Sequence, residues 1–187
     1  MNYIISGPGR TGGHLMINII KSTGTDSVHY THDPELYLNN DAETTLIVLD
    51  RRDRFAAVMS NAIVHHTGQS VWYENKNIQP FELSPGVFRW AYVQYIDYYR
   101  KHDLARPYAA VYKIYFEDFV NNHNYIKKIL NLPNLPVAPD SKIYKLLNSP
   151  APYNYKDIVV NWEKLQRLYN QLADNQQYAR NHGSQHS

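Results

Sequence analysis

The residues best placed to do chemistry lie in a glycine-rich stretch near the start of the sequence, SGPGRTGGHLM, from Ser6 to Met16. An apolar run precedes it, and apolar residues at helical spacing follow it. A glycine-rich turn from a strand into a helix exposes backbone N–H groups at the positive end of the helix, where anions bind. We therefore predict a phosphate-binding loop with Arg10 as its cation. The alternative is a plain strand–helix turn.

This loop differs from the loop of nucleotide hydrolases at two positions. That loop reads G-x-x-x-x-G-K-[ST], in which the lysine contacts the β- and γ-phosphates and the hydroxyl binds Mg²⁺. Here Gly13 stands where the lysine would be, and His14 replaces the hydroxyl residue. The backbone cradle is kept, whereas the γ-phosphate clamp and the magnesium ligand are not. A divergent P-loop kinase or hydrolase is therefore the less favoured interpretation.

A second candidate anion site follows the apolar run TTLIVL. Arg52 comes shortly after this run, and Ser60 comes eight residues later in a predicted helix. Eight residues are a little over two helical turns, so we expect both side chains to face one spot above the sheet. A guanidinium and a hydroxyl together suit a phosphate group. The alternative is a solvated basic run, because Arg51 and Arg54 are close by.

Among the nine histidines, His32 is the candidate for proton transfer because it ends a predicted strand. Imidazole is the side chain that accepts protons near neutral pH. An ordinary surface or capping histidine is the alternative. The pairs His65-His66 and His29-x-x-His32 point their members in different directions on a helix or strand. With no cysteine and no H-E-x-x-H motif, no metal site is predicted.

The elements that must position these residues alternate along the chain. Apolar and β-branched runs predict strands over 3–6, 27–31, 44–49 and 109–114. Apolar spacing predicts helices after the glycine-rich loop and over 53–66, 87–101, 116–130, 141–147 and 161–178. This alternation predicts an α/β fold of three layers, with a central parallel sheet of about four to five strands flanked by helices. Ligands of such sheets bind at the carboxyl ends of the strands, where Arg10, His32 and Arg52 would meet.

Composition narrows the class of protein. The 187 residues suit one domain, over 1–187, with a polar frayed tail from about residue 180. A net charge of +2 is too small to indicate nucleic-acid binding, and the absence of cysteine excludes disulfides. No basic segment precedes the first apolar run, and no apolar run reaches about 18 residues, so neither a signal peptide nor a membrane span is predicted. We expect a soluble, cytoplasmic protein.

These segments together resemble the sulfotransferases that use 3′-phosphoadenosine 5′-phosphosulfate (PAPS). The family's first loop reads P-[KR]-S-G-T-T, and the segment from Pro8 to His14 is similar to it with one additional glycine. The family's second motif, R-N-P-x-D-x-x-x-S after a strand, is matched by Arg52 and Ser60. A strand ending in T-H is matched by Thr31-His32. The family's Y-E-D-L segment is matched by the FEDF segment at 116–119.

The resemblance implies a fold similar to that of P-loop NTPases and transfer of a sulfuryl group to a hydroxyl or amine. The acceptor would be a small molecule, a carbohydrate or another hydroxyl-bearing compound, and the product 3′-phosphoadenosine 5′-phosphate (PAP). His32 would be the base, and Arg10 would stabilise the leaving phosphate without a metal. The implied cofactor-binding residues are Pro8, Gly9, Arg10, Thr11, Gly12, Gly13, His14, Arg52, Ser60 and Phe116.

The sequence also departs from the family pattern. Arg54 and Ala56 replace the proline and aspartate of the second motif, and Phe116 replaces the tyrosine of the later one. The R-K-G-x-x-G-D-W segment that covers the 3′-phosphate in cytosolic members is absent. A non-catalytic protein of the same fold, which binds a nucleotide or another partner, is therefore the main alternative.

Overall fold

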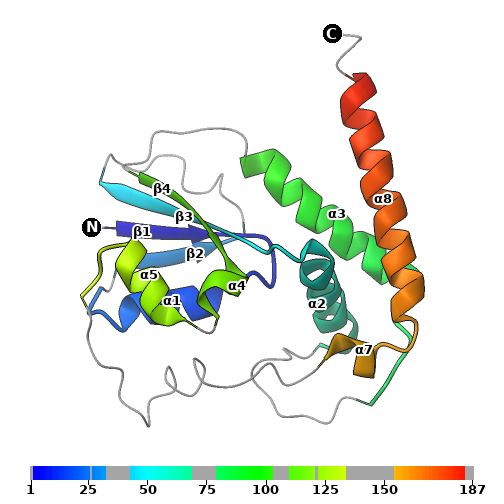
Figure 1. Cartoon of the computed structure of the whole chain (residues 1–187), viewed down its shortest axis with the longest axis horizontal. Helices are drawn as coiled ribbons and strands as arrows, with labels where there is room; N and C mark the ends of the chain where they lie inside the picture. Colours follow the sequence, from blue (N-terminus) through cyan, green and yellow to red (C-terminus); the bar gives the residue numbers. More distant parts are fainter. Residues whose placement is uncertain are drawn as a thin grey trace.

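A parallel β-sheet forms the centre of the fold in the computed structural model, which describes residues 2–25, 27–32, 43–68, 79–102, 110–120, 122–133 and 154–183. Its four strands are β1 (Asn2–Ser6), β2 (Val28–Thr31), β3 (Thr44–Asp50) and β4 (Ala110–Tyr115). They run parallel in the order β2-β1-β3-β4 (Figure 1). The predicted parallel sheet with flanking helices is confirmed.

The register of the sheet places the carboxyl ends of the strands at one edge. Ser6 of β1 pairs with Thr31 of β2 and with Val48 of β3, and Asp50 of β3 pairs with Tyr115 of β4. All seven residues of β3 are buried. This burial accounts for the continuous apolar run, because an inner strand of a parallel sheet is covered on both faces. The segments that carry the candidate residues leave the sheet at this edge.

One face of the sheet is covered by α1 (Gly13–Lys21), α4 (Phe116–Phe119) and α5 (His123–Ile129). Met16, Ile19 and Ile20 of α1 are fully buried there, at the spacing that an amphipathic helix requires. The prediction of one helix over 116–130 is wrong. Asn122 has non-helical backbone angles, and its side chain accepts a hydrogen bond from the Tyr125 amide, so it begins a separate helix.

The other helices pack mainly on one another. They are α2 (Arg54–Thr67), α3 (Pro85–His102), the short α7 (Tyr155–Ile158) and α8 (Trp162–Gly183). Figure 1 shows them as a group beside the sheet, and their shared core includes Phe55, Met59, Phe88 and Leu165. α3 also reaches the sheet face opposite α1, where the Tyr98 hydroxyl donates to Ser6 Oγ at 2.9 Å.

Two residues fix the ends of α2, which carries Ser60. Asp53 is the N-cap and accepts a hydrogen bond from the Ala56 amide at 2.8 Å, so it satisfies an amide that has no partner in the helix. Gly68 ends the helix with φ 67°, a left-handed conformation that glycine adopts without strain. The predicted helix over 53–66 is confirmed to within one residue at each end.

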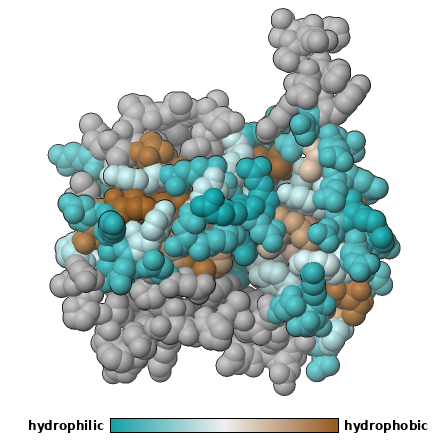
Figure 2. Space-filling view, in the orientation of Figure 1, coloured by the Kyte–Doolittle hydropathy of each residue, from teal (hydrophilic) through white to brown (hydrophobic). Residues whose placement is uncertain are grey.

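The surface of the described part is mostly hydrophilic in the view of Figure 2, with apolar residues in separate spots. No helix among the described residues is long and apolar enough to span a membrane. α8 continues to Gly183, past the predicted end near residue 178. The predicted helix over 141–147, the Asp33-Pro34 turn and the last four residues of the tail lie outside the described residues.

Candidate functional site

The loop between β1 and α1 is folded tightly onto itself. The buried Thr11 hydroxyl donates to the Pro8 carbonyl oxygen at 2.8 Å. A Cβ on Gly7 would lie 2.5 Å from Thr11 Oγ1 and 3.0 Å from Leu49 Cβ, so no larger residue fits without movement of the loop. Thr11 therefore holds the shape of the loop through its side chain.

Arg10 lies in the middle of this loop and has a strained backbone conformation. Its φ is 72°, in the left-handed region that non-glycine residues avoid at a cost of about 1–2 kcal/mol. Its side chain crosses to α2, where Nε donates to Ser60 Oγ at 3.2 Å. Strain of this kind persists where the surrounding contacts hold it, and it is common at ligand sites.

The amino end of α1 is open toward the same space. Gly12, with φ 88°, is the N-cap, and no side chain caps the helix. The first turn has no acidic residue, so the partial positive charge of the helix end is not offset there. A Cβ on Gly13 would collide with the ring of Tyr30. Glycine at this position thus lets Tyr30 pack directly under the helix end.

His32 follows β2 and is tied to the loop by its ring. Its Nδ1 lies 2.9 Å from the Gly7 carbonyl oxygen and 3.2 Å from the Tyr30 hydroxyl. A carbonyl oxygen only accepts hydrogen bonds, so the Gly7 contact requires a proton on Nδ1. In that tautomer of the neutral ring, Nε2 has a free lone pair that can accept a proton.

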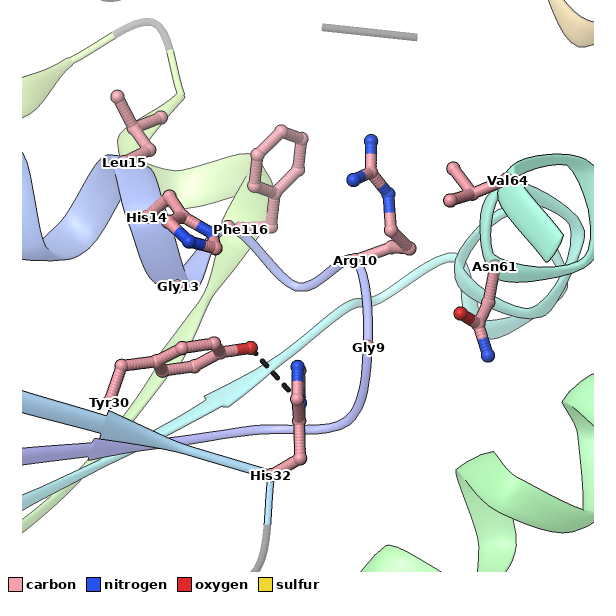
Figure 3. Close-up of a pocket in the computed structure, with 11 residues that line it drawn as sticks. Gly9, Arg10, Gly13, His14, Leu15, Tyr30, His32, Asn61, Val64 and Phe116 are labelled. Carbon is pink, nitrogen blue, oxygen red and sulfur yellow. Dashed lines mark hydrogen bonds between the residues drawn. The ribbon is translucent and has the colours of Figure 1, made fainter. Parts of the chain in front are cut away.

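These groups line one cavity of about 270 Å³ at the carboxyl edge of the sheet (Figure 3). Its lining residues are Gly9, Arg10, Gly12, Gly13, His14, Leu15, Tyr30, His32, Asn61, Val64 and Phe116. The structure thus brings together seven of the sequence-predicted residues from three elements. Pro8, Thr11, Arg52 and Ser60 are not among the described residues that line it. The roles of all these residues stay predictions.

The expectation that Arg52 and Ser60 face one spot is corrected by their partners. Arg52 forms a bidentate ion pair with Asp118, with Nη2 2.9 and 2.8 Å from the two carboxylate oxygens, and its guanidinium lies over the Tyr115 ring. Ser60 instead meets Arg10. The physical reason is that Arg52 precedes α2 and turns toward the end of β4, whereas Ser60 lies within α2 and faces the β1–α1 loop.

A parallel ion pair joins the same two connections. Arg51 Nε lies 3.4 Å from Glu117 Oε1, and Glu117 Oε2 accepts from the Arg52 amide at 3.0 Å. The Arg51 guanidinium also lies 4.7 Å from the centre of the Phe116 ring. Arg51 and Arg52 are thus paired with the two acidic residues of α4, and Phe116 lies between Arg51 and the cavity.

Comparison with protein-family models, with curated proteins and with solved structures finds no match to this chain. Its function must therefore be inferred from the site itself. No group of three or more His, Asp or Glu side chains that could hold a metal ion occurs within the described ranges.

Four lining residues were not predicted from the sequence: Leu15, Tyr30, Asn61 and Val64. Tyr30 had a usable signal, because it lies two residues before His32 and alternation in a strand puts such a pair on one face. Asn61 and Val64 follow Ser60 on α2 but carried no motif. Their approach to the loop is visible only in three dimensions, where Gly9 lies against the Asn61 amide.

A buried carboxylate, that of Asp50, lies at the carboxyl end of β3, near the site. Asp50 ends β3 and is fully buried, with Oδ1 accepting from the Tyr95 hydroxyl at 2.8 Å and from the Arg51 amide at 2.7 Å. Its Oδ2 lies 3.1 Å from Lys113 Nζ, as an ion pair rather than an aligned hydrogen bond. Burial opposes ionisation, but the hydroxyls of Tyr99 and Tyr95, the Arg51 amide and the Lys113 ammonium together outweigh it and hold the Asp50 pKa below its usual range.

The arrangement suits an oxyanion ligand that undergoes group transfer. It combines a fixed guanidinium, an uncapped helix end and a histidine with an available lone pair around one small cavity. A guanidinium and a helix end of this kind can stabilise negative charge, and a histidine with an available lone pair can remove a proton from a nucleophile.

Proposed function

We propose that this chain is a sulfotransferase that moves the sulfuryl group of PAPS to an acceptor hydroxyl or amine. The observation that carries the proposal is that Arg10, His32 and the first residues of α1 line one cavity (Figure 3). The order of elements also fits a P-loop-like fold, because a glycine-rich loop joins β1, an inner strand, to α1. The choice of PAPS as the donor comes from the resemblance of these motifs to those of the sulfotransferase family.

The residues present fit the phosphosulfate end of such a donor. The backbone cradle depends on glycines: a Cβ on Gly13 would collide with Tyr30, and a Cβ on Gly9 would lie only 3.0 Å from Asn61 Oδ1. The amides of the first turn of α1 would hold the 5′-phosphate, and Arg10 would reach the sulfuryl group and its bridging oxygen. Because the pKa of a guanidinium exceeds about 12, Arg10 stabilises charge on the leaving phosphate but donates no proton to it.

His32 would act on the acceptor. Its Nε2 takes the proton of the acceptor as the acceptor oxygen or nitrogen bonds to sulfur. The bond from sulfur to the bridging oxygen breaks, and its electron pair leaves with the phosphate of PAP. The Gly7 carbonyl orients the ring by accepting from Nδ1. The imidazolium then carries two N–H groups, one of which still points at that carbonyl.

Arg52 would bind the 3′-phosphate by exchanging its carboxylate partner. The Arg52 side chain is 60% exposed and its pair with Asp118 is screened by water, so the pair contributes little to stability. A phosphate can replace the carboxylate in the same bidentate geometry. This assignment no longer includes Ser60, which belongs to the Arg10 side of the site.

The experiment is a PAPS turnover assay. Wild-type protein is incubated with labelled PAPS and a panel of phenols, sugars and amines, and PAP release and labelled acceptor are measured. The proposal expects PAP release that depends on an acceptor, and His32→Ala should lower it by about 10²–10⁴. ATP hydrolysis that requires Mg²⁺ would instead support a divergent P-loop enzyme.

A second function stays open: a non-catalytic nucleotide-binding protein of this fold. It is favoured by the Arg52–Asp118 pair, which fills the arginine's bidentate face. That function predicts that PAP and AMP bind with similar affinity and that PAPS is not turned over with any acceptor tested.

A further inference from the structure

Tyr30 lines this cavity, and none of the sequence motifs includes it. Tyr30 lies in β2, its ring packs against the position of Gly13, and it lines the cavity together with His14 and His32. The hydroxyl points toward the His32 ring in Figure 3. The ring of His14 also lies near the Tyr30 ring, with 5.7 Å between the ring centres. The phenol thus contacts two imidazoles near the open end of α1.

The direction of the hydrogen bond between Tyr30 and His32 follows from the third partner. Nδ1 faces the Gly7 carbonyl oxygen at 2.9 Å and the Tyr30 oxygen at 3.2 Å. The carbonyl has no proton to give, so Nδ1 carries one and shares it between the two oxygens. The Tyr30 oxygen therefore accepts in this contact. Its own proton is left to point elsewhere.

The buried environment of Tyr30 keeps its phenol protonated. Burial raises the Tyr30 pKa far above its ordinary value, against a smaller opposing influence of the Arg10 charge. The group thus stays a neutral O–H donor at physiological pH. A donor of this kind beside a guanidinium and an uncapped helix end is suited to an anionic oxygen.

We propose that Tyr30 is a further ligand-binding residue of this site, whose O–H donates a hydrogen bond to an oxygen of the bound oxyanion. The chain of donors runs from His32 Nδ1 to the Tyr30 oxygen and from the Tyr30 proton to the ligand. This inference deepens the proposed function and rests on it only for the identity of the ligand. The anion-binding role itself holds for any tetrahedral oxyanion in the cavity.

The first test reads the tautomer of His32 by ¹H–¹⁵N NMR of the wild-type protein above the pH at which its histidines are protonated. A proton on Nδ1 is the expected result. A proton on Nε2 would overturn the inference. Nδ1 would then accept the hydrogen bond from the Tyr30 hydroxyl, which could no longer donate its proton to the ligand.

The second test compares wild-type, Tyr30→Phe and Tyr112→Phe proteins by titration with inorganic sulfate and with PAP. Tyr112 is the matched control, since it packs against the same core cluster from β4 but does not line the cavity. Tyr30→Phe keeps the ring under α1 and should weaken both ligands about 10- to 150-fold, the range for one hydrogen bond to a charged group. Tyr112→Phe should bind both like wild type.

The outcomes separate the two proposals. Sulfate binding that is weakened by Tyr30→Phe, with PAP no tighter than sulfate, supports Tyr30 and contradicts the proposed function. Tight PAP binding that is equal in wild type and Tyr30→Phe contradicts Tyr30 and leaves the function standing. Absence of any anion binding to the wild-type protein contradicts both.

Discussion

Arg10 and Ser60 are joined by a hydrogen bond of 3.2 Å from the guanidinium Nε to the hydroxyl oxygen. The bond connects the β1–α1 loop to the middle of α2, fifty residues away along the chain. Ser60 is almost fully buried and so has a fixed position, and its contact with Arg10 therefore orients the Arg10 side chain. It assigns Ser60 to the same part of the site as Arg10.

The first prediction follows from that assignment. Ser60→Ala removes the acceptor that orients Arg10, and it should weaken PAP and AMP alike, by about 2- to 10-fold. AMP lacks the 3′-phosphate, so calorimetric titration with both ligands separates the two sides of the site. A loss confined to PAP would show that Ser60 reads the 3′-phosphate, as its spacing from Arg52 first suggested.

The left-handed backbone conformation at Arg10 should lower the stability of the fold, and the Arg10 side chain should be needed for turnover. Its φ of 72° suits glycine, so Arg10→Gly should have a free energy of unfolding about 1 kcal/mol higher than Arg10→Ala. Both variants should lose about 10²–10³ in turnover, the size of effect when one transition-state donor is removed. Chemical denaturation and the PAPS assay measure the two quantities. Equal stability of the two variants would contradict the strained loop.

Asp118 should compete with the 3′-phosphate for Arg52. Asp118→Asn removes the charge that occupies the guanidinium, so PAP binding should become several-fold tighter, whereas AMP binding should not change. Arg52→Ala should weaken PAP about 10- to 100-fold, as expected for loss of a charge-assisted contact. If Asp118→Asn affects both ligands equally, Arg52 does not bind a 3′-phosphate.

The pH dependence of stability should contain a contribution from Asp50. Its pKa is depressed in the folded state, so the native state binds fewer protons than the unfolded state as pH falls. The stabilisation is complete above the ordinary carboxyl pKa of about 4 and is lost as pH falls through the lower folded pKa. Asp50→Asn should lower the free energy of unfolding by about 1–3 kcal/mol at pH 7.

Denaturant unfolding from pH 7 to pH 2 measures this contribution. The difference between wild type and Asp50→Asn should shrink below about pH 4, where the carboxylate of the unfolded wild-type chain begins to bind a proton, and should be lost as pH falls through the lower pKa of the folded state. A difference that stays constant over this range would mean that the loss comes from packing rather than from charge.

Local patterns made much of this structure predictable. The strands follow from apolar runs, and the loop that carries Arg10 follows from its glycines. The partners of the basic residues were not predictable, because Arg52 and Asp118 are 66 residues apart and helical periodicity does not determine where a side chain before the helix points. The break before α5 depends on a single asparagine cap, Asn122, within a segment that otherwise has helical spacing. Tyr30 belongs to no motif, and its spacing of two residues from His32 is the only sign in the sequence that it lines the site.

The most direct test of the proposed function is calorimetric titration of the wild-type protein with PAP and AMP, with a chelator present to remove Mg²⁺. The account predicts micromolar binding of PAP and at least roughly tenfold weaker binding of AMP, because the charge-assisted contact of Arg52 to the 3′-phosphate contributes only to PAP. Chelation should change neither value. Absence of PAP binding up to millimolar concentration would contradict the account.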